Sequence, residues 1–295
     1  MSAVGSTNVS PSSLPSAGVH QTRPLTAAVP LILLSFDAEE FDLPLELGQQ
    51  IDAATQLAVG REGMVRTLDL LARVAAATGK PISTTFFCTV VFAEANADLI
   101  RLAVHHGHEI ASHGVRHTGW TDADLATSRR ELSRISGIEV IGFRRARLAE
   151  TDRSLIEQAG YRYNSSENPT WIPGRYNRFF KPRLPYRTGR LLNIPASVTP
   201  LIRMPLFWLS FKVLPLWATR LASRSVLARD LALVLYFHPW ELCELQSFRV
   251  PRSVRSCDGT AMIRKLEAHL VWLSTKGQFA TYAELSRRIV AARPA

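Results

Sequence analysis

The feature that most constrains the fold is an alternation of short apolar runs with amphipathic segments along most of the chain. The apolar, strand-like runs lie at residues 31–36, 82–88, 108–112, 139–143, 161–166, 191–197, 231–237 and 278–282. The segments with helical periodicity lie at residues 63–79, 97–107, 121–136, 152–160 and 260–277. Strands and helices that alternate at this spacing predict βαβ units and a parallel sheet. Roughly seven units in roughly 260 residues predict a barrel-like α/β domain, not two separate domains.

The chain has 295 residues, enough for one large domain. Residues 1–29 are rich in Ser, Pro, Ala and Thr, and we expect them to form a disordered tail. We expect residues 30–288 to form one folded domain and residues 289–295 to form a C-terminal tail. The first segment lacks a basic start followed by an apolar run, so it predicts no secretory signal, and the cytoplasm is the expected location.

The composition limits the classes of partner. The formal net charge of +10 suits anionic partners such as nucleotide-linked substrates or lipid headgroups. No run of Lys and Arg is interleaved with aromatic residues, so the sequence does not predict nucleic-acid binding. The three cysteines form no C-x-x-C pair, which argues against a disulfide framework and a cysteine zinc site; we expect Cys243 to be inert.

Residues 201–222 are strongly apolar and aromatic, but Pro205, Lys212 and Pro215 interrupt them. A membrane-spanning helix needs about 20 mostly apolar residues without such breaks. We therefore expect a helical cover that packs on the domain. The alternative is peripheral membrane contact, because aromatic and basic side chains together suit the lipid headgroup region. The aromatic residues of this segment are Phe207, Trp208, Phe211 and Trp217.

Polar residues follow the predicted strands. Asp37, His113, Arg144, Asn164 and His238 each come at or just after the end of an apolar run. The active sites of barrel enzymes are built at the carboxyl ends of parallel strands. We therefore expect these residues to lie near one another.

The segment "SHGVRH" places His113 and His117 four residues apart, which on a helical turn puts both imidazoles on one face. The acidic residues 37–42 after the first strand can supply a third ligand. Two histidines and one carboxylate are typical of a catalytic metal with open coordination positions. A separate carboxylate would then act as the general base. The alternatives are two surface histidines on a helix, or the same ligand set in an iron oxygenase.

With these residues in order, the chain resembles the polysaccharide deacetylase family, carbohydrate esterase family 4. In "SFDAEEFD", Asp37 matches the catalytic base of the family and Glu39 matches the metal-binding acid, with Glu40 as the competing ligand. In "HGVRH", His113 and His117 match the histidine ligands, and Gly114 replaces the usual Ser or Thr.

Two later motifs complete the resemblance. In "FRRAR", Arg144 matches the arginine that positions the catalytic carboxylate, and Ala replaces the usual proline at position 146. In "LYFHPWE", His238 matches the histidine that protonates the leaving amine. The resemblance covers residues 30–285 and implies a single-domain, distorted (β/α)7 barrel with one divalent metal, expected to be zinc.

The resemblance also implies an N-deacetylase that acts on an N-acetylated sugar or glycan. The segments at 160–166, 168–177 and 194–200 resemble a branch associated with bacterial surface-polysaccharide or O-antigen synthesis. The candidate substrate-binding residues are Arg175, Tyr176, Trp171, Trp240 and Asn164. Relatives of this fold also hydrolyse non-sugar C–N bonds, as in allantoin, so a hydrolase of that kind is the alternative; a degenerate binding protein is a further one.

Overall fold

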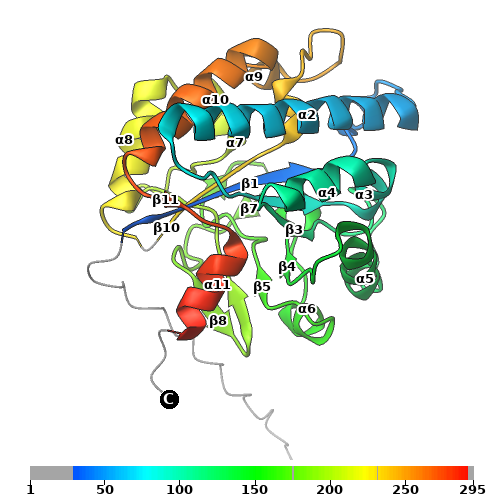
Figure 1. The fold of residues 1–295 in the computed structure, drawn as a ribbon, viewed down its shortest axis with the longest axis horizontal. Helices are drawn as coiled ribbons and strands as arrows, with labels where there is room; N and C mark the ends of the chain where they lie inside the picture. The colour runs from blue at the N-terminus through cyan, green and yellow to red at the C-terminus, as the bar shows by residue number, and fades with distance from the viewer. Residues whose placement is uncertain (1–28, 175, 231, 292–295) are drawn as a thin grey trace, which may run out of the picture.

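The first strand, β1, lies inside a curled sheet that organises the domain (Figure 1). The computed structural model describes residues 29–174, 176–230 and 232–291. Within these residues the sheet has nine strands, in the order β10-β1-β2-β3-β4-β5-β9-β8, with β11 paired to the first residues of β1. Its pairs are parallel except for β8 with β9.

The strands of the sheet are β1 (Leu31–Ala38), β2 (Thr85–Cys88), β3 (Glu109–Ser112), β4 (Gly142–Phe143), β5 (Tyr163–Asn164), β8 (Tyr186–Thr188), β9 (Leu191–Asn193), β10 (Ala232–Phe237) and β11 (Gln278–Phe279). A separate antiparallel pair consists of β6 (Trp171–Ile172) and β7 (Tyr176–Asn177). All eight predicted strand runs therefore contain a strand, although several strands are shorter than their runs.

The helices are α1 (Leu43–Glu46), α2 (Ala53–Thr78), α3 (Val90–Ala95), α4 (Ala97–His105), α5 (Asp124–Ser136), α6 (Arg153–Gln158), α7 (Trp208–Val213), α8 (Leu216–Leu227), α9 (Arg252–Arg255), α10 (Gly259–Ser274) and α11 (Tyr282–Ala291). Short 3₁₀ helices are η1 (Ala146–Leu148) and η2 (Pro239–Leu242). In Figure 1, α2 and α10 lie along one side of β1, and α11 lies on the other.

Buried side chains of β1 alternate between two clusters. Leu31 and Leu33 pack with Tyr163 inside the curled sheet, whereas Ile32 and Leu34 pack toward the surrounding helices. Burial on both faces explains why the strand is a continuous apolar run. The polar residues that follow on the inner face are therefore carried to the carboxyl edge of the sheet.

The segment after β9 joins the two ends of the sheet. The backbone N–H of Ser197 donates to the carbonyl of Val234 in β10 at 3.1 Å. The backbone N–H of Val234 in turn donates to the Ser197 hydroxyl at 2.9 Å. These bonds curl the sheet toward a barrel, as the sequence predicts.

Two predicted boundaries differ from the structure. The helix predicted at 63–79 begins at Ala53, because the Asp52 side chain caps it by accepting from the N–H of Thr55 at 2.7 Å. α11 continues to Ala291, beyond the domain end predicted at residue 288. The proposed tails at 1–28 and 292–295 lie outside the described residues.

The 201–222 segment is folded onto the domain. Phe207 and Phe211 are buried and Trp208 is half-buried, whereas Trp217 is 70% exposed. Phe207 and Phe211 are therefore core residues that cannot face a membrane. None of the described helices combines the length and the apolar character that crossing a bilayer requires.

Candidate metal-binding and catalytic site

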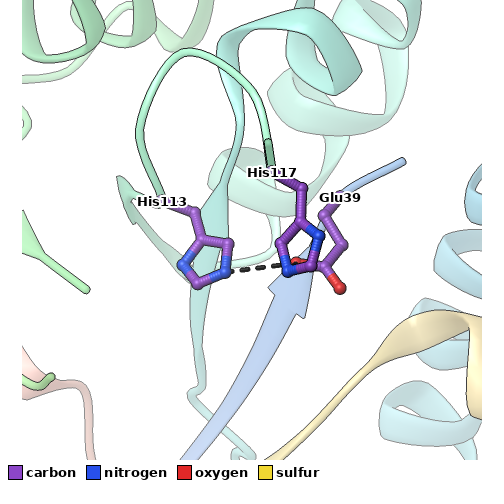
Figure 2. Close-up of side chains that lie close together, drawn as sticks. All are labelled: Glu39, His113 and His117. Atoms are coloured by element: carbon purple, nitrogen blue, oxygen red, sulfur yellow. Dashed lines mark ion pairs between the residues drawn. The ribbon is translucent and has the colours of Figure 1, made fainter. Parts of the chain in front are cut away.

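The two histidines of "SHGVRH" lie in a loop after β3, not on the helical turn that their spacing predicted. Gly114 has a φ of 95°, a backbone conformation that favours glycine and turns the chain sharply after His113. The loop returns far enough to bring the two imidazoles into a stacked pair with ring centroids 6.1 Å apart. Figure 2 shows both rings on the side of the loop that faces Glu39.

Glu39 follows β1 directly and is buried beside these imidazoles. Its Oε2 atom lies 3.1 Å from Nε2 of His113 and 3.4 Å from Nε2 of His117. Glu40 instead accepts a hydrogen bond from the Thr89 hydroxyl at 2.6 Å, and burial raises its pKa. The structure therefore brings Glu39, and not Glu40, together with the two histidines.

The outer nitrogens of both imidazoles have partners that fix the rings. Nδ1 of His113 lies 2.9 Å from the carbonyl oxygen of Arg144. Because a carbonyl only accepts, this nitrogen must donate, and it is Nε2 that is directed toward Glu39. Nδ1 of His117 lies 2.8 Å from Oδ1 of Asp42. Carboxylate or carbonyl partners of this kind commonly orient metal-ligating histidines.

The donor set fits a divalent cation. One ligand atom from each of Glu39, His113 and His117 lies within 4.8 Å of the others. Oε2 of Glu39 is buried between the two Nε2 atoms and receives no well-directed hydrogen bond from the described residues, and a cation at this point would compensate its charge. Nitrogen and carboxylate oxygen donors in this number suit zinc with an open coordination position.

The charges of the cluster are strongly coupled. Burial acts to raise the pKa of Glu39, but the neighbouring imidazoles of His117, His113 and His238 lower it to about 2. Burial acts to lower the pKa of His117, but the carboxylates of Glu39 and Asp42 raise it to about 9. Without a cation, the Glu39 carboxylate is thus stabilised by protons on the neighbouring imidazoles, and a metal that bound there would displace the proton from Nε2 of His117.

Asp37 lies at the end of β1, and its two oxygens face different groups. Oδ1 accepts from Nη1 of Arg144 at 2.5 Å. Oδ2 lies 4.0 Å from Nε2 of His113, on the side of the candidate metal ligands. Arg144 therefore fixes one oxygen and leaves the other directed toward the cluster.

Arg144 is fully buried and almost completely bonded. Its guanidinium donates to Ser35 Oγ at 3.0 Å, to the Ser165 carbonyl at 3.1 Å and to the Tyr282 hydroxyl at 2.9 Å. It also lies over the Phe87 ring, 4.0 Å from the centroid. This network holds the arginine, and hence Asp37, in one geometry.

Tyr282 and Asp42 belong to the site although the sequence analysis did not single them out. Tyr282 is the first residue of α11 and reaches Arg144 from a distant part of the chain. Nothing in its local sequence indicates that contact. Asp42 lies in the acidic stretch after β1, so its proximity to the predicted ligands was the available indication.

His238 follows β10 and faces Glu39 from the other side. Its Nε2 lies 3.9 Å from Oε1 of Glu39. Its Nδ1 lies 3.0 Å from Oε1 of Glu241, which also accepts from the His238 backbone N–H at 2.7 Å. Burial acts to lower the pKa of His238, but the bond to Glu241 and the charges of nearby carboxylates raise it. This environment favours an imidazolium that can donate a proton.

Two of the candidate substrate-binding residues are in the protein interior. Trp240 is buried, stacks on His238 with ring centroids 4.8 Å apart, and directs Nε1 toward Oε1 of Glu39 at 3.4 Å. Asn164 is buried and donates to Asn193 at 3.2 Å. Trp240 thus forms a wall of the site and has little free ring face for a sugar.

The remaining candidates lie at the β6–β7 pair. Trp171 is exposed, and the guanidinium of Arg178 lies 4.5 Å from the centroid of the Tyr176 ring. Arg175 is outside the described residues. A role of these side chains in substrate binding stays a prediction.

Comparisons with known proteins agree with this architecture. The family model for "Polysaccharide deacetylase" matches residues 68–163, a span that includes His113, His117 and Arg144. A solved structure assigned as a polysaccharide deacetylase from Mycobacterium smegmatis is 15% identical, with a TM-score of 0.63, and the match covers 94% of this chain and 100% of that one. The chain has the polysaccharide deacetylase fold.

Two further structures share this deacetylase-type (β/α)7 barrel. One, assigned as a polysaccharide deacetylase from Pseudomonas aeruginosa PAO1, is 18% identical, with a TM-score of 0.63 over 90% of this chain and 92% of that one. The other, Puue allantoinase, is 17% identical, with a TM-score of 0.59 over 90% of this chain and 91% of that one. No curated protein matches the sequence. The predicted fold class is confirmed.

Proposed function

We propose that the protein is a metal-dependent N-deacetylase that hydrolyses the acetamide of an N-acetylated sugar. The observation that supports this most directly is the convergence of Glu39, His113 and His117 on one point, with Asp37 and His238 beside them. The polysaccharide deacetylase match to residues 68–163 supports the same class of reaction.

A divalent cation held by Glu39, His113 and His117 would lower the pKa of water and polarise the amide carbonyl. Asp37 is the general base in this proposal. Its Oδ2 faces the cluster and takes the proton from the attacking water, while Arg144 holds Oδ1 at 2.5 Å and prevents the carboxylate from rotating away.

His238 is the general acid. When the bond between the carbonyl carbon and nitrogen breaks, Nε2 of His238 gives its proton to the departing amine, and acetate is released. Glu241 supports this role because it fixes Nδ1 at 3.0 Å, so that Nε2 points back toward Glu39 and the reacting group.

For the pathway, we propose surface-polysaccharide synthesis in bacteria, with the enzyme in the cytoplasm. The resemblance of the segments at 160–166, 168–177 and 194–200 to that branch supports this assignment. The net charge of +10 is compatible with an anionic carrier on the substrate. Nucleotide-linked and lipid-linked sugars both meet this condition.

The decisive experiment measures acetate release from N-acetylated sugars offered free, nucleotide-linked, lipid-linked and as polymer. The metal content of the same preparation is determined, and the Asp37→Asn variant is the catalytic control. Metal-dependent acetate release that the variant lacks supports the proposal. If the metal-loaded protein released acetate from none of these sugars, the proposed N-deacetylase activity would be contradicted.

A second candidate is a hydrolase of non-sugar C–N bonds, favoured by the similarity of the fold to Puue allantoinase. The same ligand set and the same acid and base can serve that reaction. Hydrolysis of cyclic ureides such as allantoin, in parallel with the sugar panel, separates the two because ring opening releases no acetate.

We also propose peripheral contact with an anionic membrane through the face that contains α8. A cavity of about 530 Å³ there is lined by the apolar residues Leu201, Ile202 and Leu221 together with Arg224 and Arg229. The side chains of both arginines lack an ion pair within the described part of the chain. Apolar groups with free cations at their edge suit a lipid headgroup region.

A further inference from the structure

A lysine is buried in the apolar 201–222 segment. Lys212 belongs to α7, and its side chain is completely shielded from solvent. Its Nζ donates to the carbonyl oxygen of Cys257 at 2.5 Å and lies 3.6 Å from Oε2 of Glu241. A lysine is rarely buried without a carboxylate partner, and Glu241 is here the charge that compensates it.

Glu241 is equally buried, and its two oxygens have separate partners. Oε1 accepts from both the backbone N–H and Nδ1 of His238. Oε2 accepts no hydrogen bond from any residue of the described ranges and faces the ammonium of Lys212. The carboxylate therefore lies between the ammonium and the imidazole.

Through Glu241, Lys212 affects the orientation of the His238 imidazole, which it does not contact. A carboxylate in an apolar interior reorients toward whatever cation or donor is available, because an uncompensated buried charge is costly. Lys212 attracts Oε2 and leaves Oε1 in the position that holds the ring. Because Lys212 is anchored at the Cys257 carbonyl, that direction is fixed by the packing of α7.

We propose that Lys212 is a positioning residue for His238 and acts through Glu241. The inference rests on the proposed function, in which His238 protonates the leaving amine. Without Lys212, the Glu241 carboxylate turns, the imidazole loses its fixed orientation, and proton donation slows. Substrate binding involves neither residue, so kcat falls while KM is retained.

The test compares Lys212→Met, Glu241→Gln and the double variant with the wild type. We measure kcat and KM for acetate release, the urea midpoint of unfolding and the metal content. We expect kcat to fall about 10- to 100-fold in each single variant, the range found when a partner that orients a metal-ligating histidine is removed. The double variant restores the urea midpoint, because neither charge is left alone, but its kcat stays as low as in Glu241→Gln.

Lys265→Met is the matched control. Lys265 also lies against α7, where its Nζ donates to the carbonyl oxygens of Phe211 at 2.5 Å, Lys212 at 3.2 Å and Leu214 at 2.7 Å, so its replacement loosens the same helix without removing the ammonium that faces Glu241. Its loss should lower the urea midpoint while leaving kcat unchanged. A wild-type kcat in Lys212→Met, or a kcat in Lys265→Met as low as in Lys212→Met, would show that Lys212 has a structural role alone.

A readout that does not depend on activity separates this inference from the proposed function. The Nδ1–H proton of His238 should give a downfield NMR resonance in the wild type that is absent from His238→Gln. We expect Lys212→Met to broaden or shift it, and Lys265→Met to leave it in place. An unchanged resonance in Lys212→Met overturns the positioning role, whether or not acetate is released. Absence of acetate release with an altered resonance overturns only the assigned reaction.

Discussion

The carboxylate of Glu39 is placed where a cation would stabilise it most. Its Oε2 lacks a hydrogen-bond donor among the described residues and lies within 3.4 Å of Nε2 on both His113 and His117. Each outer imidazole nitrogen has its own acceptor, so the inner nitrogens face Glu39 and become metal donors once the proton on His117 is displaced. The cluster is therefore the candidate ligand set.

The first prediction concerns the identity of the metal-binding acid. Glu39→Gln, His113→Ala and His117→Ala should each reduce zinc binding severely, because two remaining ligands chelate weakly. Glu40→Gln is the matched control and should retain zinc, since Glu40 is bonded to Thr89 instead. Zinc stoichiometry after dialysis, with titration calorimetry, checks this. Loss of zinc from Glu40→Gln together with its retention by Glu39→Gln would exchange the two assignments.

The second prediction separates the base from the ligands. Asp37→Asn should keep the metal, because Asp37 lies outside the three-ligand cluster. It should lower kcat about 10²- to 10⁴-fold, the usual cost of removing a general base. Acetate release and metal content measured on one preparation test both parts. An apo variant would place Asp37 among the ligands.

Residue types and their order along the chain were sufficient to find most of the candidate site. Asp37, His113, Arg144 and His238 could be selected because each comes at or just after the end of an apolar run, whereas the choice of Glu39 over Glu40 rested on the family resemblance. The contact of Tyr282 with Arg144 could not be predicted, because it depends on how α11 packs against the far end of the sheet.

At the scale of elements, the strand pattern was more informative than the helix pattern. Full burial of β1 on both faces produces a run that is hard to mistake. The four-residue spacing of His113 and His117 was misleading, because the same proximity arises in a loop that Gly114 turns at a φ of 95°. Spacing alone cannot distinguish a helical turn from a turned loop.

The third prediction concerns the effect of pH on stability through two buried histidines, His269 in α10 and His108 directly before β3. Burial lowers the pKa of His269 to about 3 and that of His108 to about 4, from 6.5 in an exposed histidine. Both are neutral in the folded protein, whereas the unfolded chain takes up protons below pH 6.5. The two buried histidines therefore do not lower the free energy of unfolding above about pH 6.5. As the pH falls from 6.5 toward 4, the free energy of unfolding decreases by about 1.4 kcal/mol per pH unit for each histidine.

Urea unfolding at several pH values between 7 and 4.5 measures this loss. His269→Gln should show a shallower decline than the wild type, because one of the two titrating groups is gone. His105→Gln is the control, since His105 is exposed, and should follow the wild type. If the free energy of unfolding depended on pH equally in the wild type, His269→Gln and His105→Gln, we would conclude that other groups cause the loss of stability in acid.

At the scale of the whole molecule, the curled sheet explains why Asp37 and His238, which are 201 positions apart in the chain, meet. Asp37 lies at the end of β1 and His238 directly follows the neighbouring parallel strand β10, so their side chains reach the same edge. The closure between Ser197 and Val234 brings the two ends of the sheet together. The alternation of strands and helices predicted the parallel sheet and its polar carboxyl edge. It did not predict the contact between Ser197 and Val234.

The last prediction concerns the exposed face that contains α8. Trp217 and Leu221 are 70% and 62% exposed and are four residues apart on α8, so they share one side of the helix with Arg224. Leu201 and Ile202 join Leu221 along the same cavity. We expect the wild type to sediment with anionic vesicles and to be released by salt, because the arginines contribute through screened charge.

A Trp217→Ser/Leu221→Ser variant should lose most of this sedimentation while retaining its urea midpoint, since neither side chain is buried. Phe180→Ser is the matched control, because Phe180 is also highly exposed but lies outside the residues that line this cavity. It should sediment like the wild type. Equal sedimentation of all three proteins, or sedimentation with neutral and anionic vesicles alike, would remove the headgroup interaction from consideration. The exposed residues Trp217 and Leu221 would then be expected to bind a different partner. Exposed apolar side chains next to Arg224 and Arg229, which have no ion pair among the described residues, are typical of an interaction surface.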